Sequence, residues 1–278
     1  MDESTEAGKA LEWIEMDPNP DIVLGHAPIG RRANIRLELR RLRRDPLGEL
    51  VEAIDGDESP LLGNPRTRYQ DAYCFYYLSL DRYLHEMSVA ARYSRGPDRR
   101  SGGRQKFNPA QRKLAAQQKQ VARFYEYDLV NCLIHSRILL DRVAGISQSF
   151  LTGAKLPSFT SFSKHKKFFA DLTAPYGLHE EYAQYIRTQT DWFEMPLREV
   201  RDKFVVHAAP KHMRFLGYSG GRGEHELDLN IILPDDKRSL AAVKVISVNA
   251  LRLAYDMDAF LKWVCQYGLK ALHQKLEN

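Results

Sequence analysis

The pattern best suited to chemistry is a short run in which an arginine, an aspartate and a histidine occur together. Arg201 and Asp202 precede His207, and five residues separate the arginine from the histidine. An arginine is permanently charged and fits phosphate oxygens bidentately, whereas a histidine moves protons near neutral pH. Such a pair could cleave RNA without a metal, with the ribose 2′-hydroxyl as the attacking group. Asp202 would orient the arginine or tune the histidine.

The two principal side chains do not share one side of an ideal helix. At about 100° per residue, Arg201 and His207 lie on opposite flanks of the apolar face, roughly 120° apart. They could still converge where the last turn unwinds, or across a two-fold axis that pairs two copies of the helix. The apolar face itself is formed by Phe193, Leu197, Val200 and Phe204.

The same run also fits an ordinary, salt-bridged helix surface. Opposite charges recur four residues apart, and such pairs stabilise exposed helices. A histidine at a helix C-terminus is favoured by the helix dipole. Under this alternative, Arg201 makes salt bridges within its own subunit and His207 packs against a neighbouring hairpin. The spaced pairs are Glu194–Arg198, Arg198–Asp202 and Glu199–Lys203.

A second polar pattern lies in the long helix predicted from Asn108 to about Leu151. Its members are separated by three, four and seven residues amid apolar neighbours, and buried polar groups need partners. The stripe could face the Arg201 helix and support His207, or it could lie at the boundary between helix and solvent. Its members are Asp128, Asn131, His135 and Arg142.

A metal-dependent hydrolase is a third hypothesis for the same stripe. Asp128 and His135 are two helical turns apart, which is too far for one ion unless neighbouring helices add carboxylates. We therefore predict no metal site and no cofactor.

Arginine is concentrated in two other stretches, and the chain carries a net charge of +5 with a pI of about 9.0. Such runs could track the phosphates of a nucleic acid, although solvated faces and loops are their commoner role. One run occupies residues 31–44. The other lies in a Gly- and Pro-containing loop and offers Arg99, Arg100, Arg104 and Lys106 for RNA contact.

The stretch LREVRDKFVVHAAP (197–210) resembles the HEPN superfamily, a group of small helical bundles with an Arg-x4–6-His motif. It follows the helix text YDLVNCLIHSRILLDRVAGI (127–146) and the segment SFTSFSKHKKF (158–168), in the order of elements typical of that family. Asp202 occupies the polar position after the arginine. The resemblance covers roughly residues 115–210 and does not include the N-terminal third.

The resemblance implies a metal-independent endoribonuclease site, usually assembled between two subunits. Arg201 and His207 would be the catalytic pair and Asp202 their modulator. Many members of the superfamily are toxins, defence proteins or RNA-processing proteins, and others have lost catalysis and only bind or scaffold. We therefore expect a homodimer that acts on RNA, with an antitoxin or another protein as a further candidate partner.

Composition indicates the class of protein and the cellular compartment in which this chemistry would occur. Apolar residues make up 44% of the chain and charged residues 28%, which is typical of a globular protein. The first residues are acidic and lack the apolar core of a signal peptide, and no run of eighteen apolar residues occurs. The three cysteines are far apart and are expected to be core thiols in a reducing compartment. We expect a cytoplasmic location and no membrane contact.

Apolar periodicity predicts the elements that would position these residues. Long helices are expected at about 65–93, 108–151, 178–206 and 240–276, with a shorter helix within 158–172. Residues 31–44 fit both a strand and a helix, and we favour an Arg-rich helix that continues after Pro46. A glycine-rich turn between alternating residues predicts a β-hairpin at about 213–233.

These elements together predict an all-α, HEPN-like bundle of long antiparallel helices with a short β-hairpin before the last helix. Residues 1–62 would form an N-terminal extension that carries the Arg-rich segment. Residues 63–278 would form the helical bundle domain.

Overall fold

The computed structural model of the chain is mainly helical in the part that it describes. The helices are α3 (Gly48–Ile54), α4 (Pro65–Ser94), α5 (Pro109–Phe150), α6 (Phe162–Phe169), α7 (Glu180–Gln189) and α8 (Ala250–Glu277). The described residues are 23–24, 33–34, 42, 44–54, 65–94, 109–151, 156–157, 159–171, 179–194, 197–198, 214–218, 229–236 and 239–277.

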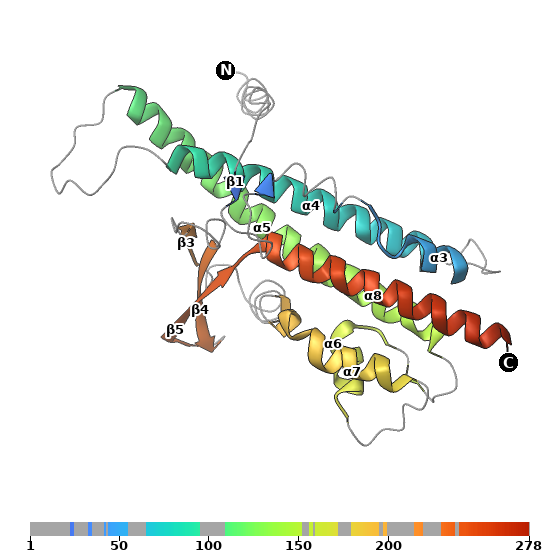
Figure 1. The fold of residues 1–278 in the computed structure, drawn as a ribbon. Coiled ribbons are helices and arrows are strands. Elements are labelled where there is room, and N and C mark those ends of the chain that lie inside the picture. Colours follow the sequence, from blue (N-terminus) through green and yellow to red (C-terminus); the bar gives the residue numbers. More distant parts are fainter. Residues whose placement is uncertain are drawn as a thin grey trace.

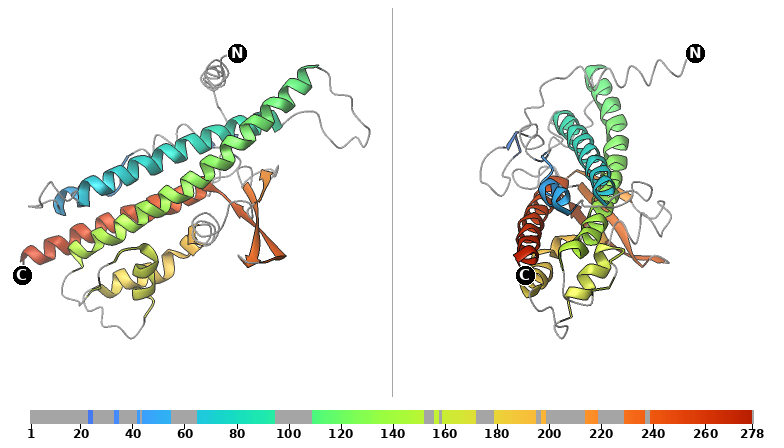
Figure 2. Two further views of the ribbon diagram at one scale, coloured as in Figure 1. Left: turned by 180° about the vertical axis from the view of Figure 1, so that it is seen from behind. Right: turned by 90° about the vertical axis from the view of Figure 1, so that its right-hand side faces the viewer.

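Helices α4, α5 and α8 are the three long elements and run side by side (Figure 1). Helices α4 and α5 form an antiparallel pair, and α8 packs against both of them and against α3. Helices α6 and α7 lie along one side of α5 and α8, and the views in Figure 2 show the same arrangement from two further directions. The prediction of long helices at about 65–93 and 108–151 is confirmed.

Tyrosines at three- and four-residue steps bury one face of α4. Tyr69, Tyr76 and Tyr83 are at most 5% exposed. The hydroxyl groups of this tyrosine stripe also bind the chain before α3. Tyr73 Oη donates to Leu42 O at 2.7 Å. Tyr69 Oη donates to Asp45 Oδ1 at 2.7 Å. The aromatic stripe that predicted this helix therefore supplies both apolar area and directional hydrogen bonds.

The core around α6 and α7 is largely aromatic. Phe162 packs edge-on against Phe260 of α8, with ring centroids 5.4 Å apart. Tyr185 of α7 stacks on Trp263 of α8 at 3.7 Å, with the ring planes 5° from parallel. Aromatic pairs of this kind stabilise beyond the area that they bury. They fix the α6–α7 unit on the long helices.

The predicted hairpin corresponds to β3 (Arg214–Tyr218) and β4 (Leu229–Asp236), which pair antiparallel. A third strand, β5 (Ser239–Val248), pairs antiparallel with β4. The prediction that the last helix starts near Leu240 was wrong, since α8 begins at Ala250. The β-branched, alternating sequence of 239–248 favours a strand. Asn249 Oδ1 then accepts from Arg252 N at 3.0 Å, which caps the start of the helix.

The single helix predicted over 178–206 was also wrong. Helix α7 ends at Gln189 and is followed by a 3₁₀ turn, η3 (Asp191–Phe193). Thr190 Oγ1 donates to Ile186 O at 2.6 Å, and Pro196 lacks the amide hydrogen that a continuing helix requires. The described bundle therefore contains three long helices, where the sequence suggested four.

Two smaller predictions also differ from the structure. Within 31–44, where we favoured a helix, Ala33–Asn34 forms strand β2, which pairs antiparallel with β1 (Val23–Leu24), whereas Leu42 is helical. Most of the other residues of this stretch lie outside the described residues. Cys132 and Cys265 are buried as expected, but Cys74 is exposed on α4. A short run that fits both a helix and a strand adopts the structure for which it finds a partner, and the periodicity of its own sequence does not show that partner.

Part of the predicted N-terminal extension shares the main core. Leu42, Leu47, Leu50 and Val51 join the same apolar cluster as α4, α5 and α8. The boundary at residues 62 and 63 stays a prediction. Among the described helices, none has a stretch long and apolar enough to cross a membrane.

Helix α8 approaches α3 closely at Gly268. A Cβ atom there would lie 2.6 Å from Leu50 Cδ2 and 3.2 Å from Phe150 Cδ1. Both neighbours are at most 1% exposed, so neither can move into solvent. We expect Gly268→Ala to lower the free energy of unfolding by about 1–2 kcal/mol, because overpacking outweighs the gain in helix propensity. Urea denaturation measures the change.

Gly145 of α5 is the matched control, because a Cβ atom there meets nothing within 4 Å. Gly145→Ala should stabilise the protein by up to about 1 kcal/mol. Shortening Leu50 to alanine should make the Gly268→Ala substitution less costly than in the wild type. Equal effects of the two glycine substitutions would contradict the close approach.

Candidate functional site

The residues predicted to act on RNA lie outside the part of the chain that the structure describes. This holds for Arg201, Asp202 and His207, and also for the loop cations Arg99, Arg100, Arg104 and Lys106. Their mutual distances therefore stay predictions. Of the chain that precedes Arg201, the structure describes residues 179–194 and 197–198.

The approach to Arg201 is fastened to the core at two points. Leu197 and Phe193 have no exposed surface and belong to the main apolar cluster. Arg198 is exposed and forms an ion pair with Glu194, one of the pairs that its spacing predicted. The pairs that involve Asp202 and Lys203 lie outside the described residues.

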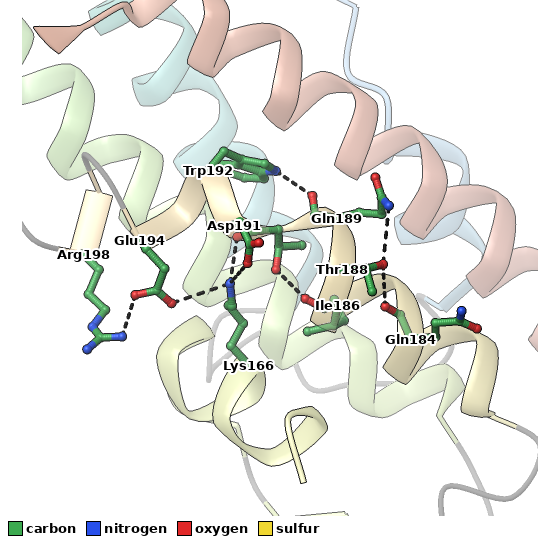
Figure 3. A network of polar contacts seen from close by, with 10 residues as sticks. Lys166, Gln184, Ile186, Thr188, Gln189, Asp191, Trp192, Glu194 and Arg198 are labelled. Atoms are coloured by element: carbon green, nitrogen blue, oxygen red, sulfur yellow. Dashed lines mark hydrogen bonds and ion pairs between the residues drawn. The ribbon is translucent and has the colours of Figure 1, made fainter. Parts of the chain in front are cut away.

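Lys166 of α6 reaches across to the end of α7 and to η3, as Figure 3 shows. Its Nζ donates to Thr190 O at 2.9 Å and lies 3.5 Å from both Asp191 Oδ1 and Glu194 Oε1. The side chain is only 15% exposed. One ammonium therefore satisfies a carbonyl at the helix end and two carboxylates of the turn that follows.

Arg137 of α5 is the most deeply buried charged side chain in this region, at 3% exposure. Its Nη2 donates to Ser163 Oγ of α6 at 2.8 Å, and its Nε lies 3.4 Å from Asp141 Oδ1. The same Asp141 oxygen accepts from Phe162 N, at the start of α6, at 2.7 Å. One ion pair on α5 thus orients the first turn of α6.

Phe193 lies close to both cations. The Arg137 Cζ atom is 4.6 Å from the centroid of the Phe193 ring, and Lys166 Nζ is 5.9 Å from it. A cation near an aromatic face is attracted by the ring quadrupole, more strongly where water is excluded. We call Arg137, Asp141, Ser163, Lys166 and Phe193 the cationic cluster. It joins α5, α6 and η3.

The polar stripe of α5 is divided between different environments. Asp128 is 2% exposed, and its Oδ2 lies 2.8 Å from Arg82 Nε of α4. His135 stacks on Phe75 of α4, with centroids 5.6 Å apart, and partial burial lowers its pKa. Asn131 is half-buried and Arg142 is exposed. Both assigned partners, Arg82 and Phe75, belong to α4, and the exposed Arg142 fits the alternative in which the stripe lies at the boundary between helix and solvent. A contact of the stripe with the Arg201 segment stays a prediction, because that segment lies outside the described residues.

No cluster of three or more metal-binding side chains occurs among the described residues. Asp128 has an arginine as its neighbour, and a cation beside the carboxylate disfavours a second positive ion there. These contacts give no support to the metal-dependent hydrolase hypothesis within the described part of the chain. Burial raises the pKa of the Cys132 thiol to about 12, which keeps that thiol protonated.

A buried histidine was not singled out by its sequence spacing. His165 of α6 has no exposed surface, and its ring packs edge-on against Phe159 at 4.8 Å and Phe169 at 4.9 Å. Its Nε2 lies 3.2 Å from Tyr182 Oη, and its Nδ1 has no hydrogen-bond partner among the described residues. Burial lowers the pKa of His165 to about 3, so the ring is neutral near pH 7.

The paired helices α4 and α5 expose large apolar side chains. Phe75 and Leu78 of α4 are each 55% exposed, and Tyr127 of α5 is 63% exposed. Phe75 lies where α4 meets α5, because its ring stacks on His135, and Leu78 is three residues further along the same face of α4. Exposed apolar side chains that gather on one face are typical of a protein contact surface.

Sequence reasoning missed the cationic cluster. Arg137 and Asp141 are four residues apart in an otherwise apolar stretch, with Leu133, Leu140 and Ala144 on the same face as the arginine. A charged pair in the phase of a buried face was therefore a usable signal. Lys166 and Phe193 gave no comparable signal, because their meeting depends on the break after α7.

Comparison with models of known protein families, with curated protein sequences and with solved structures finds no match to this chain. The resemblance to HEPN proteins therefore stays a prediction that depends on the quoted motif and the order of elements.

The burial of His165 predicts a stability that depends on pH. In the unfolded chain the pKa of this histidine is about 6.5, whereas in the folded protein it is about 3. Between these two pH values the unfolded state therefore binds a proton that the folded state does not bind. The contribution of His165 to the free energy of unfolding should be constant above pH 6.5. As the pH is lowered from 6 to 4, the free energy of unfolding should fall by about 1.4 kcal/mol per pH unit. Urea denaturation at pH 7.5 and pH 5 measures the slope.

His165→Gln should remove this part of the slope, whatever its effect on stability at pH 7.5. His273→Gln is the matched control, because His273 is exposed on α8. A wild-type slope that His165→Gln leaves unchanged would show that the imidazole does not control acid sensitivity.

Proposed function

We propose that this chain is a HEPN-like, metal-independent endoribonuclease that acts as a homodimer. The observation that carries the proposal is the Arg201–Asp202–His207 pattern, which begins three residues after the ion-paired Arg198. A toxin or a defence protein is the class of function proposed, with an antitoxin as a candidate protein partner. The proposed reaction needs no cofactor.

The chemistry assigns a separate task to each residue. His207 accepts the proton of the ribose 2′-hydroxyl, and the 2′-oxygen attacks phosphorus to form a 2′,3′-cyclic phosphate. The bond from phosphorus to the 5′-oxygen breaks, and the 5′-oxygen takes up a proton from water or from a protonated His207 of the second subunit. Arg201 binds the phosphate oxygens and stabilises the charge that develops on them. Asp202 orients the guanidinium or tunes the imidazole. Two copies of the segment, one from each subunit, line one cleft.

Features of the described chain support this proposal without testing its chemistry. The helices α5, α6 and α7 occur in the order of elements on which the resemblance depends. The turn η3, which contains Trp192, ends eight residues before Arg201 in the sequence. The cations Arg99, Arg100, Arg104 and Lys106 are proposed to contact the RNA backbone, where binding would weaken with salt.

Cleavage of a labelled RNA in excess EDTA tests the catalytic pair. We expect wild-type protein to cut, and His207→Ala and Arg201→Ala each to lower the rate about 100-fold or more, since acid–base and phosphate-binding groups contribute at that level. Arg198→Ala is the matched control, because Arg198 is an exposed arginine on the same segment. Its rate should stay within about threefold of wild type.

Two results would overturn the proposed chemistry. One is equal cutting by wild type, Arg201→Ala and His207→Ala, which would assign the activity to another site or another protein. The other is the absence of cutting by wild type on single-stranded and structured RNA, freed of any protein partner.

A catalytically inactive HEPN-fold binding or scaffold protein is the second candidate function. It is favoured by the exposed apolar face formed by Phe75, Leu78 and Tyr127. The partner that the resemblance implies is a second copy of the chain, and an apolar face of this kind gains free energy when a partner removes it from water.

The double substitution Phe75→Ser and Leu78→Ser tests this surface. Both side chains are more than half exposed, so we expect the thermal midpoint to change by no more than about 2 °C. We expect light scattering to show weaker self-association than in wild type, by about tenfold or more in Kd. Thr67→Ala, an exposed site nearer the start of α4, is the control. Unchanged self-association would exclude this face as the contact between copies.

A further inference from the structure

The cationic cluster has a composition that core packing alone does not require. Arg137 is 3% exposed and Lys166 is 15% exposed, yet both lie against the ring of Phe193. Buried cations are costly to desolvate, and an apolar side chain of similar size is often as stabilising or more so. What a guanidinium adds is direction, because its donors require partners at fixed angles.

The hydrogen bonds and ion pairs of the cluster connect three elements that are far apart in sequence. Arg137 binds Ser163 of α6 and contacts Phe193 of η3, while Asp141 holds the first amide of α6. Lys166 then ties α6 to the carbonyl of Thr190 and to the carboxylates of Asp191 and Glu194. The turn after α7 is thereby held from two sides.

We propose that Arg137 and Lys166 are positioning residues for the predicted nuclease site. They hold residues 190–194 on α5 and α6, in the turn that precedes Arg201 in the sequence. This inference rests on the proposed function, because the site that is positioned is the one assigned there to RNA cleavage.

Only a short stretch of chain separates the turn from Arg201. Consecutive Cα atoms are about 3.8 Å apart, and an extended chain advances at most about 3.5 Å per residue. Three residues of an extended chain span at most about 10 Å, and Arg201 is three residues beyond Arg198 in the sequence. We therefore expect a displacement of the turn to change the catalytic geometry, where errors of about 1 Å reduce rates strongly.

Limited digestion with trypsin measures the positioning without using the nuclease activity. Trypsin cuts after arginine and lysine, and Arg198 and Arg201 report on how firmly this stretch is held. In Arg137→Met and in Lys166→Met we expect cutting after these residues to be about tenfold faster than in wild type. Lys167→Met is the matched control, since Lys167 is an exposed neighbour on α6, and it should digest like wild type.

Kinetics on RNA separate positioning from a general loss of structure. We expect both variants to lower kcat by about tenfold or more while KM changes less than threefold. Arg137→Lys keeps a cation near Phe193 but not the forked donor, and should recover part of kcat. The thermal midpoint of each variant is measured alongside. If Arg137→Met does not fold, Lys166→Met decides, because its side chain lies nearer the surface.

The outcomes separate this inference from the function on which it rests. If wild type does not cleave RNA, the proposed function fails, and trypsin still decides whether the two cations hold the turn. If both variants digest like wild type, the positioning role is overturned, whatever the nuclease assay shows. A rise in KM with kcat unchanged would also overturn it, because that result assigns the cations to RNA binding.

Discussion

Every polar side chain that is buried on α5 must find a partner inside the protein, and this requirement organises the rest of the structure. Between residues 127 and 150, one side of the helix is enclosed, with Leu129, Leu133, Leu140 and Val143 fully buried. Ser136 and Ser147 are satisfied locally, by the carbonyls of Cys132 and Ala144. Asp128 and Arg137 also reach beyond their own helix. Asp128 pairs with Arg82 of α4, and Arg137, which pairs with Asp141 of α5, donates in addition to Ser163 of α6. Each buried charge thereby fixes a neighbouring helix.

The long helices could be predicted because their burial is periodic over many turns. Helices α4 and α5 end within one or two residues of the limits that periodicity and the Asn108-Pro109 start predicted. Strand β5 and the break at Thr190 could not be predicted in this way. The first depends on pairing with β4. The second combines local causes, the Thr190 hydroxyl and Pro196, with Lys166 of α6, which donates to the Thr190 carbonyl. Contacts between segments distant in sequence contribute to both, and a local pattern does not contain them.

The candidate site was predictable to a smaller extent. Spacing identified the Glu194–Arg198 ion pair and drew attention to the polar stripe of α5, for which it left two surroundings open. Among the described residues, Asp128 and His135 contact Arg82 and Phe75 of α4. Periodicity indicates which residues share a face of a helix, but it does not contain which neighbouring helix meets that face. The Arg201–His207 motif lies outside the described residues, and its assignment depends on sequence alone.

A cluster that costs free energy to bury must be explained by what an apolar replacement would lose. Methionine at position 137 could fill the space beside Phe193, but it could not donate to Ser163 or pair with Asp141. Without those bonds, the start of α6 and the turn of η3 could shift against α5, because aromatic contacts are tolerant of small rotations. For a scaffold that binds through the α4–α5 face, such a shift would have little effect. For an enzyme whose arginine lies three residues beyond the turn, it would move the reacting group, so a buried and directional anchor at this place favours the catalytic candidate over the inactive one.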